Sequence, residues 1–470
     1  MHLQKPLLLI PVENQVRELD AKLLLTCAAA KRGIDSIIGP RRQVEFRISS
    51  FPRSVFISKD LTSGNGRLFR ILNQLGHVSV AWDEEGLIHQ PAEIYFKERF
   101  AASALKYVSH LFAWGPNNAE LWRQFSEMPA DKPIHITGNP RGDMLRREMR
   151  PFFEDEVKQI QQVHKDFILI NTNFGAVNAF TPIQNLIQSK GEEGEKPELG
   201  RTAKGMDPQY AVKYRRHIQS IFEDIKQLIL DLDRAFPEIT IVVRPHPDED
   251  PQIYHEIAPR CRNVRVTNEG NVLPWLIATK ALIHNGCTTG VEAYAMGVPA
   301  IAYRATADNF FDKGIYHLPN SLSHQCFSFE ELQRTLDRIL AGQLGVPNGN
   351  EPQTLFQRYF AAQEGAFAAE RIADIIKEIA ANTSEWPDPG LGVRLTGRYR
   401  AIQRRLKKRL KSYLSNASIT PDFERHRYPG ISLAAMQERI SRFRQVLKYD
   451  NEIKAVPIWR QMYKISTRGN

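Results

Sequence analysis

The feature that most constrains this chain is residues 239–304, where short apolar runs alternate with polar, glycine-bearing loops. A β-branched run opens the stretch and is broken by Arg244-Pro-His-Pro247. A second run, 281–283, ends in His284-Asn-Gly-Cys-Thr-Thr-Gly290 and passes into a helical segment. Such runs are typical of buried parallel strands. Because parallel sheets bind ligands at the carboxyl ends of their strands, we expect the ligand-binding residues in these two loops.

The first third of the chain shows the same alternation. Apolar runs occur at 7–12, 36–38, 54–57, 78–82, 110–113 and 134–136, and helical patterns occur at 17–31, 66–75, 95–108 and 117–125. The breaker cluster Thr137-Gly-Asn-Pro140 ends this set, and a second α/β unit begins with the apolar run 167–170. We therefore predict two Rossmann-like, doubly wound parallel-sheet domains.

The predicted fold class is α/β with a GT-B-like architecture. We place the two Rossmann-like domains at residues 1–150 and 151–345, and a helical, basic extension at 346–470. The length of 470 residues allows each domain a buried core. Four cysteines lie far apart without metal-ligand spacing, which favours a reducing cytoplasm. No apolar window is long enough to predict a membrane span.

Positive charge is concentrated in one segment of the extension. Nine basic residues and no acid occur there: Arg394, Arg398, Arg400, Arg404, Arg405, Lys407, Lys408, Arg409 and Lys411. Leu395, Tyr399, Ile402, Leu406 and Leu410 recur among them at helical spacing. Two interpretations stay open: peripheral contact with the inner face of the cytoplasmic membrane, or a solvated helix docked by its apolar stripe. A nucleic-acid partner is disfavoured because no recognised module accompanies the charge.

Histidine and hydroxyl side chains in the 239–304 stretch fit a phosphate site. His246 lies between two prolines, one of them Pro247, and can donate a hydrogen bond to a phosphate, with Arg244 adding charge. Alternatively, His246 only caps its strand. The segment Asn285-Gly286-Cys-Thr288-Thr289 opens a helix whose dipole favours anions, although either threonine also suits a plain N-cap. Glu292 has two possible roles: it accepts hydrogen bonds from a ribose, or it is simply solvated.

Acidic groups follow strands of the first domain. Asp83, Glu84 and Glu85 form a turn in which mutual repulsion can raise one pKa and create a general base, although such turns are also often solvated loops. Further polar residues after predicted strands or at helix starts are expected to contact acceptor or donor. They are Glu13, Glu18, Asp20, Asn139 and Asn173.

Three of these segments resemble the signatures of bacterial GT-B sialyltransferases and related capsule Kdo transferases. The signatures D/E-D/E-G, H-P and S-S/T match Glu84-Glu85-Gly86, His246-Pro247 and Thr288-Thr289 in that order. Over most of residues 1–340, the chain also resembles the bacterial "surface carbohydrate biosynthesis protein" family. That wider pattern is Arg17-Glu-Leu-Asp20, Asp83-Glu-Glu-Gly86, Thr137-Gly-Asn-Pro-Arg-Gly-Asp143 and Arg244-Pro-His-Pro247.

The resemblance implies a metal-independent glycosyltransferase without a cofactor. Glu84 corresponds to the general base, although Asp83 and Glu85 compete for that role here. His246, Thr288 and Thr289 correspond to the residues that contact the CMP phosphate. The first domain is then expected to bind the acceptor, and the second the nucleotide sugar. No Asp-x-Asp motif of the manganese-binding type occurs near a predicted strand end.

The leading hypothesis is transfer of a CMP-activated 3-deoxy-ulosonic acid, Kdo or sialic-acid-like, to a surface polysaccharide or lipid-linked acceptor. A CDP-polyol phosphotransferase of the teichoic-acid type is the second, and a non-catalytic binding protein the third. UDP-GlcNAc 2-epimerases share the Gly-Asn hinge. Their Ser-Gly-Gly-x-Gln-Glu stretch is absent, because this chain has His284-Asn-Gly-Cys-Thr-Thr-Gly-Val-Glu292 there.

Overall fold

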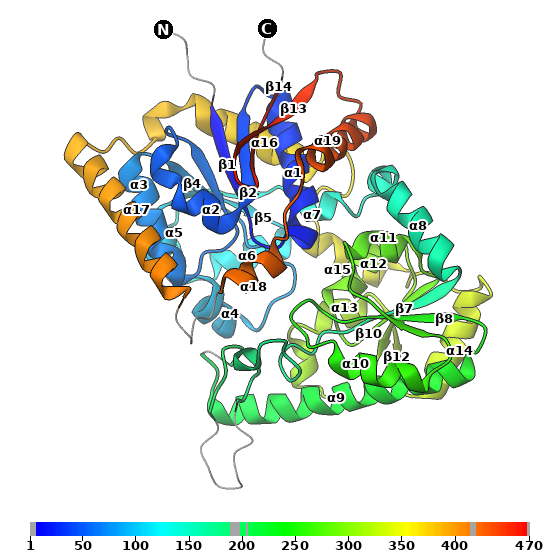
Figure 1. Cartoon of the computed structure of the whole chain (residues 1–470). Helices are drawn as coiled ribbons and strands as arrows, with labels where there is room; N and C mark the ends of the chain where they lie inside the picture. The colour runs from blue at the N-terminus through cyan, green and yellow to red at the C-terminus, as the bar shows by residue number, and fades with distance from the viewer. Residues whose placement is uncertain (1–5, 189–197, 204, 414–419, 468–470) are drawn as a thin grey trace. The chain divides into compact units, whose positions relative to one another are not determined.

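A computed structural model of the chain describes residues 6–188, 198–203, 205–413 and 420–467 (Figure 1). It divides into two compact units. Unit 1 comprises Met1–Leu87, Arg99–Phe152 and Gln357–Asn470, and unit 2 comprises Ile88–Glu98 and Phe153–Phe356. Each unit contains a sheet with a parallel core and flanking helices, which confirms the predicted α/β class with two doubly wound units.

Unit 1 is built on an eight-stranded sheet in the order β13-β14-β2-β1-β3-β4-β5-β6. Its parallel strands are β1 (Leu7–Val12), β2 (Asp35–Pro40), β3 (Val55–Ser58), β4 (Val78–Ala81), β5 (Val108–Ala113) and β6 (Ile134–Ile136). The order reverses between β1 and β3. In open α/β sheets, ligands bind at the carboxyl ends of the strands beside such a reversal.

The helices of unit 1 come from both ends of the chain. The N-terminal ones are α1 (Gln15–Lys31), α2 (Arg41–Phe46), α3 (Gly66–Leu75), α5 (Ala102–Leu105), α6 (Pro116–Arg123) and α7 (Pro140–Asp143). The C-terminal ones are α16 (Ala368–Ala381), α17 (Leu391–Lys411), α18 (Pro421–Arg427) and α19 (Leu433–Leu447). Two further helices, α4 (Ala92–Arg99) and α15 (Asn350–Tyr359), end where the chain passes between units.

Two strands occur in the C-terminal extension, where we expected only helices. β13 (Ile453–Trp459) and β14 (Met462–Thr467) form an antiparallel hairpin, and β14 pairs with β2 through Ile465 and Ser36. Pro457 explains why the sequence pattern concealed β13, because proline normally argues against a strand. Here β13 is the outermost strand of the sheet, where a missing N–H is tolerated.

The C-terminal helices are fixed to the first part of unit 1. Asp143, at the end of the Thr137–Asp143 motif, accepts hydrogen bonds from the backbone N–H groups of Ala368 (2.7 Å) and Ala369 (2.8 Å). These two groups begin α16, whose first amides have no partner within the helix. Asp143 of the motif therefore caps the start of α16 and fixes this helix to the first part of unit 1.

The basic helix α17 packs on α3 and α2 through a face that the sequence did not predict. Its buried residues are Gly397, Ala401 and Arg404. The apolar stripe of the helix lies outward, with Leu395 55% exposed and Leu410 72% exposed. The interpretation in which α17 docks by its apolar stripe is therefore wrong. No helix in the described part of the chain is both long and apolar enough to cross a bilayer.

Unit 2 contains a six-stranded, fully parallel sheet in the order β12-β11-β10-β7-β8-β9. The strands are β7 (Phe167–Asn171), β8 (Thr240–Arg244), β9 (Val264–Val266), β10 (Ala281–His284), β11 (Ala300–Tyr303) and β12 (His324–Cys326). Its helices are α8 (Glu154–His164), α9 (Pro208–Ala235), α10 (Gln252–Ile257), α11 (Val272–Ala278), α12 (Thr288–Ala295), α13 (His317–Ser321) and α14 (Phe329–Leu340). This is the Rossmann strand order, with the reversal between β7 and β10.

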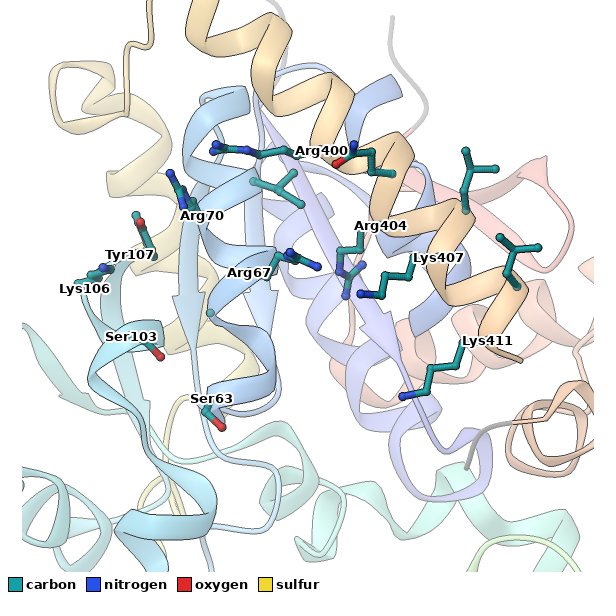
Figure 2. Close-up of a pocket in the computed structure, with 15 residues that line it drawn as sticks. Ser63, Arg67, Arg70, Ser103, Lys106, Tyr107, Arg400, Arg404, Lys407 and Lys411 are labelled. Carbon is teal, nitrogen blue, oxygen red and sulfur yellow. The ribbon is translucent and has the colours of Figure 1, made fainter. Parts of the chain in front are cut away.

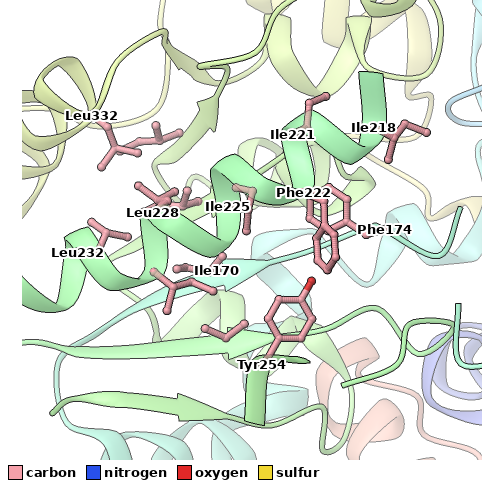
Figure 3. Close-up of a cluster of buried hydrophobic side chains, with 14 of the residues drawn as sticks. Ile170, Phe174, Ile218, Ile221, Phe222, Ile225, Leu228, Leu232, Tyr254 and Leu332 are labelled. Carbon is pink, nitrogen blue, oxygen red and sulfur yellow. The ribbon is translucent and has the colours of Figure 1, made fainter. Parts of the chain in front are cut away.

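The core of unit 2 forms along the 28-residue helix α9 (Figure 3). Ile218, Phe222, Ile225 and Leu232 recur at helical spacing and are buried toward the sheet. They pack in one cluster with side chains that include Phe174, which follows β7. This packing fixes the central strands, whose carboxyl ends carry the polar residues described next.

Candidate functional site

Three strands of unit 2 end side by side at its strand-order reversal. Asn171, the last residue of β7, is in register with His284 of β10 and with Arg244 of β8. The loop carrying Asn285 and the loop carrying His246 therefore begin at the same edge of the sheet, on either side of β7. The structure thus brings together the two loops that the sequence separates by about forty residues.

The loop between β10 and α12 is held by a buried histidine. His284 is fully buried, and its Nδ1 accepts the N–H of Gly286 at 2.9 Å. Its Nε2 lies 2.8 Å from Ser323 Oγ, whose own hydrogen goes to the Pro319 carbonyl, so Nε2 donates. Burial lowers the pKa of His284 to about 3, and the ring is neutral at physiological pH.

Two glycines allow this loop to form. Gly286 has φ +84, and a Cβ there would lie 2.0 Å from Tyr316 Cδ1. A Cβ at Gly290 would lie 2.4 Å from Nε2 of His284. Both positions therefore require glycine, and the first turn of α12 lies directly over the histidine.

Buried polar atoms without partners make this edge a candidate binding site. Within the described residues, neither the oxygen nor the nitrogen of the Asn171 and Asn285 amides has a hydrogen-bond partner, although the two side chains are only 4% and 5% exposed. The Thr289 hydroxyl, in the first turn of α12, is buried and likewise unpaired. Leaving a buried polar group unsatisfied costs about 1–3 kcal/mol, so a polar ligand at this edge would recover that energy.

His246 is oriented by its own loop. The backbone N–H of Asp248 donates to Nδ1 of His246 at 3.2 Å. In the neutral ring the proton then lies on Nε2, which makes that atom a hydrogen-bond donor. The side chain is 25% exposed. This arrangement fits the predicted contact between His246 and a phosphate.

Glu249 holds the His246 loop against β7, and our sequence analysis did not identify it as a site residue. It is 2% exposed and accepts hydrogen bonds from Thr172 Oγ1 (2.8 Å), the His246 N–H (3.1 Å) and the Tyr254 hydroxyl (2.7 Å). Burial raises the pKa of this carboxyl against the lowering effect of those donors. The signal was available in the sequence as an acid three residues after His246.

Arg244 makes different contacts from those we expected. Its guanidinium donates to the carbonyls of Glu269 (2.9 Å) and Gly270 (3.2 Å) and lies 4.8 Å from the centre of the Trp275 ring. Burial lowers its pKa to about 10, so it remains a cation at neutral pH. Arg244 thus fixes the loop before α11 with two of its five guanidinium N–H groups.

A buried ion network occupies the corresponding edge of unit 1. Glu18 accepts the backbone N–H of Glu13 (2.9 Å) and pairs with Lys22 (2.7 Å) and Lys59 (3.2 Å). Glu13 pairs with Lys59 and Arg41, both at 2.8 Å. The network lies at the carboxyl ends of β1 and β3, where the strand order of unit 1 reverses.

Each acid of the 83–85 turn lies near a cation, and Lys22, the cation beside Glu84, also pairs with Glu18. Asp83 pairs with Arg99, Glu84 lies 3.5 Å from Lys22, and Glu85 lies 3.2 Å from Arg17. For Glu85, the rise in pKa that we expected does not occur. Burial raises the pKa of Glu85, but attraction from Arg17 and Arg141 outweighs it and holds the pKa well below its usual range.

Glu84 differs from its neighbours in its surroundings. It is 2% exposed, and its Oε2 accepts the indole N–H of Trp82 at 2.8 Å. Lys22 also donates to the Pro11 carbonyl (2.8 Å), which fixes the ammonium beside Glu84. This lysine was not predicted as a site residue, because it lies on the apolar face of a predicted helix.

The remaining predicted residues are placed as follows. Asp20 pairs with Arg439 of α19 at 2.8 Å, and Asn139 caps α7 by accepting the N–H of Arg141 at 2.9 Å. Glu292 is buried in α12, and Asn173 is half-buried two residues beyond β7. Asp20 and Asn139 thus stabilise helices of unit 1. Glu292 and Asn173 lie in unit 2, which contains the candidate site.

No protein-family model matches the chain, and no curated protein matches its sequence. A variant of the wall teichoic acid polymerase TagF soaked with CDPG is similar in structure, with 12% identity, 81% of this chain and 89% of that chain covered, and a TM-score of 0.48. UDP-GlcNAc 2-epimerase from Neisseria meningitidis bound to UDP-GlcNAc has 12% identity, coverages of 81% and 100%, and a TM-score of 0.47.

The Methanocaldococcus jannaschii UDP-GlcNAc 2-epimerase in complex with UDP-GlcNAc and UDP has 13% identity, coverages of 80% and 100%, and a TM-score of 0.46. Similarity at this level assigns no activity to the chain. The functional argument therefore rests on the chain's own residues.

Proposed function

We propose that this chain is an enzyme that transfers a group from a cytidine-nucleotide donor bound at the β7–β10 edge of unit 2. The leading form is a glycosyltransferase that moves a CMP-activated 3-deoxy-ulosonic acid, Kdo or sialic-acid-like, to a surface polysaccharide or lipid-linked acceptor. The observation that carries the proposal is the set of unpaired buried polar atoms on Asn171, Asn285 and Thr289. A nucleotide offers the complementary donors and acceptors.

The polar groups at this edge suit a single phosphate. Thr289 supplies a hydroxyl, the first turn of α12 supplies backbone N–H groups, and His246 supplies the Nε2 hydrogen. Arg244, the cation that we predicted here, already donates to two carbonyls. A donor whose leaving group is CMP carries a single phosphate, so its binding needs fewer cations than the binding of a donor with a diphosphate. This favours the CMP-linked form.

In the proposed reaction Glu84 accepts the proton of the acceptor hydroxyl. The hydroxyl oxygen then bonds to the anomeric carbon of the donor, and the bond from that carbon to the CMP oxygen breaks. His246 donates a hydrogen bond to the departing phosphate. Glu85 of the same turn is a poor proton acceptor, because its pKa is held low.

Calorimetric titration with CMP tests the donor site. We expect the wild type to bind CMP, and Asn285→Ala and His246→Ala each to weaken binding by about tenfold, the value of one hydrogen bond to a charged group. His255→Ala, on the exposed face of α10, is the matched control and should bind as the wild type does. Failure of the wild type to bind any cytidine nucleotide contradicts the proposal.

The second candidate, a CDP-polyol phosphotransferase, is favoured by the same His246 loop and Thr289 hydroxyl. Both reactions release CMP, so the product distinguishes them. With a donor labelled at its β-phosphate, the phosphotransferase places label in the acceptor product, whereas ulosonic acid transfer from a CMP-sugar adds no phosphorus. A non-catalytic binding protein would release CMP in neither assay, and Glu84→Gln would not change its role.

A further inference from the structure

A basic groove of about 1350 Å³ lies in unit 1 between α17 and the segment formed by α3 and α5 (Figure 2). Six of the side chains that line it are Arg67, Arg70, Lys106, Arg400, Lys407 and Lys411. No acidic residue is among the lining residues. The groove therefore concentrates positive charge from three helical segments that are remote in sequence.

The charge of this groove is not neutralised within the described residues. A seventh cation, Arg404, pairs with the buried Glu45 at 2.6 Å. For the other six, no carboxylate lies within ion-pair distance in the described part of the chain, and Nη1 of Arg400 is buried without a hydrogen-bond partner. Like charges held this close repel one another, so binding an anion stabilises the groove.

An apolar face adjoins the groove. We call the five side chains Leu395, Tyr399, Ile402, Leu406 and Leu410 the outward stripe of α17; each is between 46% and 72% exposed. Leu406 and Leu410 also line the groove, so the two surfaces are continuous. The stripe runs from Leu395 to Leu410 of the 21-residue helix, which at about 1.5 Å per residue gives an apolar strip about 22 Å long.

We propose that the groove and the outward stripe of α17 together form a docking surface for an anionic lipid bilayer. The groove cations bind lipid phosphate groups, and the stripe enters the boundary between head groups and acyl chains. A nucleic acid would match the cations, but five exposed aliphatic and aromatic side chains along one helix have no counterpart on a phosphate backbone. This proposal goes beyond the transfer reaction, because bilayer binding requires no nucleotide.

Vesicle co-sedimentation with the full chain tests the docking surface. We expect the wild type to bind vesicles containing phosphatidylglycerol and to bind pure phosphatidylcholine vesicles at least tenfold more weakly. The double variant Arg67→Glu, Arg70→Glu should lose at least about tenfold in partitioning. Arg215→Glu, Arg216→Glu, on the exposed face of α9, makes the same change in net charge and should bind as the wild type does.

The stripe is tested separately. Leu406→Gln, Leu410→Gln should also lower partitioning at least tenfold, whereas Val163→Gln, at a 74% exposed position of α8, should not. All replaced side chains are exposed, and an unchanged Tm verifies folding. Three results would overturn the proposal: equal binding to both vesicle types, unchanged binding of the Arg67→Glu, Arg70→Glu or the Leu406→Gln, Leu410→Gln variant, or preferential binding of RNA that does not require the stripe.

Discussion

The carboxylate of Glu249 joins the end of β7 to the loop of His246, and it does so with acceptor atoms alone. Its donors include the hydroxyls of Thr172 and Tyr254 and the backbone N–H of His246. Apolar periodicity identifies strands but carries no information about which polar side chain satisfies a loop. For that reason the sequence predicted His246 and missed the residue that orients it.

Removing this acceptor should loosen the loop. Glu249→Ala leaves the three donors unsatisfied, each at a cost of about 1–3 kcal/mol before relaxation, and we expect a loss of roughly 3 kcal/mol in the free energy of unfolding. CMP affinity should fall with it. Urea unfolding and CMP titration measure the two effects. Glu256→Ala, exposed on α10, should stay within about 0.5 kcal/mol of the wild type.

The helix α12 shows how far the sequence determined the site. Its position after β10, with Thr288 and Thr289 in its first turn, followed from the run 281–283 and the glycines around it. The packing of Gly290 over His284 did not follow, because contacts between side chains in a turn depend on the whole unit. The same holds for Asn171, whose importance comes from its position between β8 and β10 in the sheet.

Gly290→Ala separates packing from helix propensity. In a helix, alanine is favoured over glycine by about 1 kcal/mol, so propensity alone predicts stabilisation. The contact with His284 predicts the opposite sign, and we expect destabilisation of about 1–3 kcal/mol in thermal or urea unfolding. Gly392→Ala in α17, where a Cβ meets nothing within 4 Å, is the control and should be neutral or mildly stabilising. A more stable Gly290→Ala would contradict the packing.

In α17 the sequence determined the helix and its charge but left its docking face open. A hydrophobic stripe ordinarily lies against the protein, and that was one of the two interpretations that the sequence allowed. The helix docks instead through Gly397, which approaches Gln74 closely, and through the ion pair of Arg404 with Glu45. Both partners come from distant parts of the chain. An amphipathic pattern therefore predicts two different faces but does not state which one is covered.

At the scale of the whole molecule, the stability of the protein at acidic pH should depend on the ion network of unit 1. Burial opposes ionisation of Glu13, but attraction from Lys59, Arg41 and Arg427 outweighs it and lowers the pKa to about 2. Because this folded-state pKa lies below the unfolded value of 4.5, the stabilisation is complete above about pH 4.5 and is lost as the pH falls toward 2.

Urea unfolding of the wild type and Glu13→Gln between pH 3 and 7 measures this contribution. The two proteins should differ most at pH 7, and the difference should shrink as the pH falls below about 4.5. Glu238→Gln, at an exposed position just before β8, should show no such convergence. A constant difference over the whole range would mean that the charge of Glu13 contributes nothing.

The pairing of β14 with β2 has a consequence for biosynthesis. Ile38 and its partner Tyr463 are joined in one sheet but lie 425 residues apart in the chain. At about 5–20 residues per second, a ribosome makes the second roughly 20–85 seconds after the first. Unit 2 has been synthesised well before then, while the edge of β2 that pairs with β14 is still unpaired. Exposed strand edges recruit other chains, so the edge of β2 is open to pairing with another chain until residues 453–467 have been made.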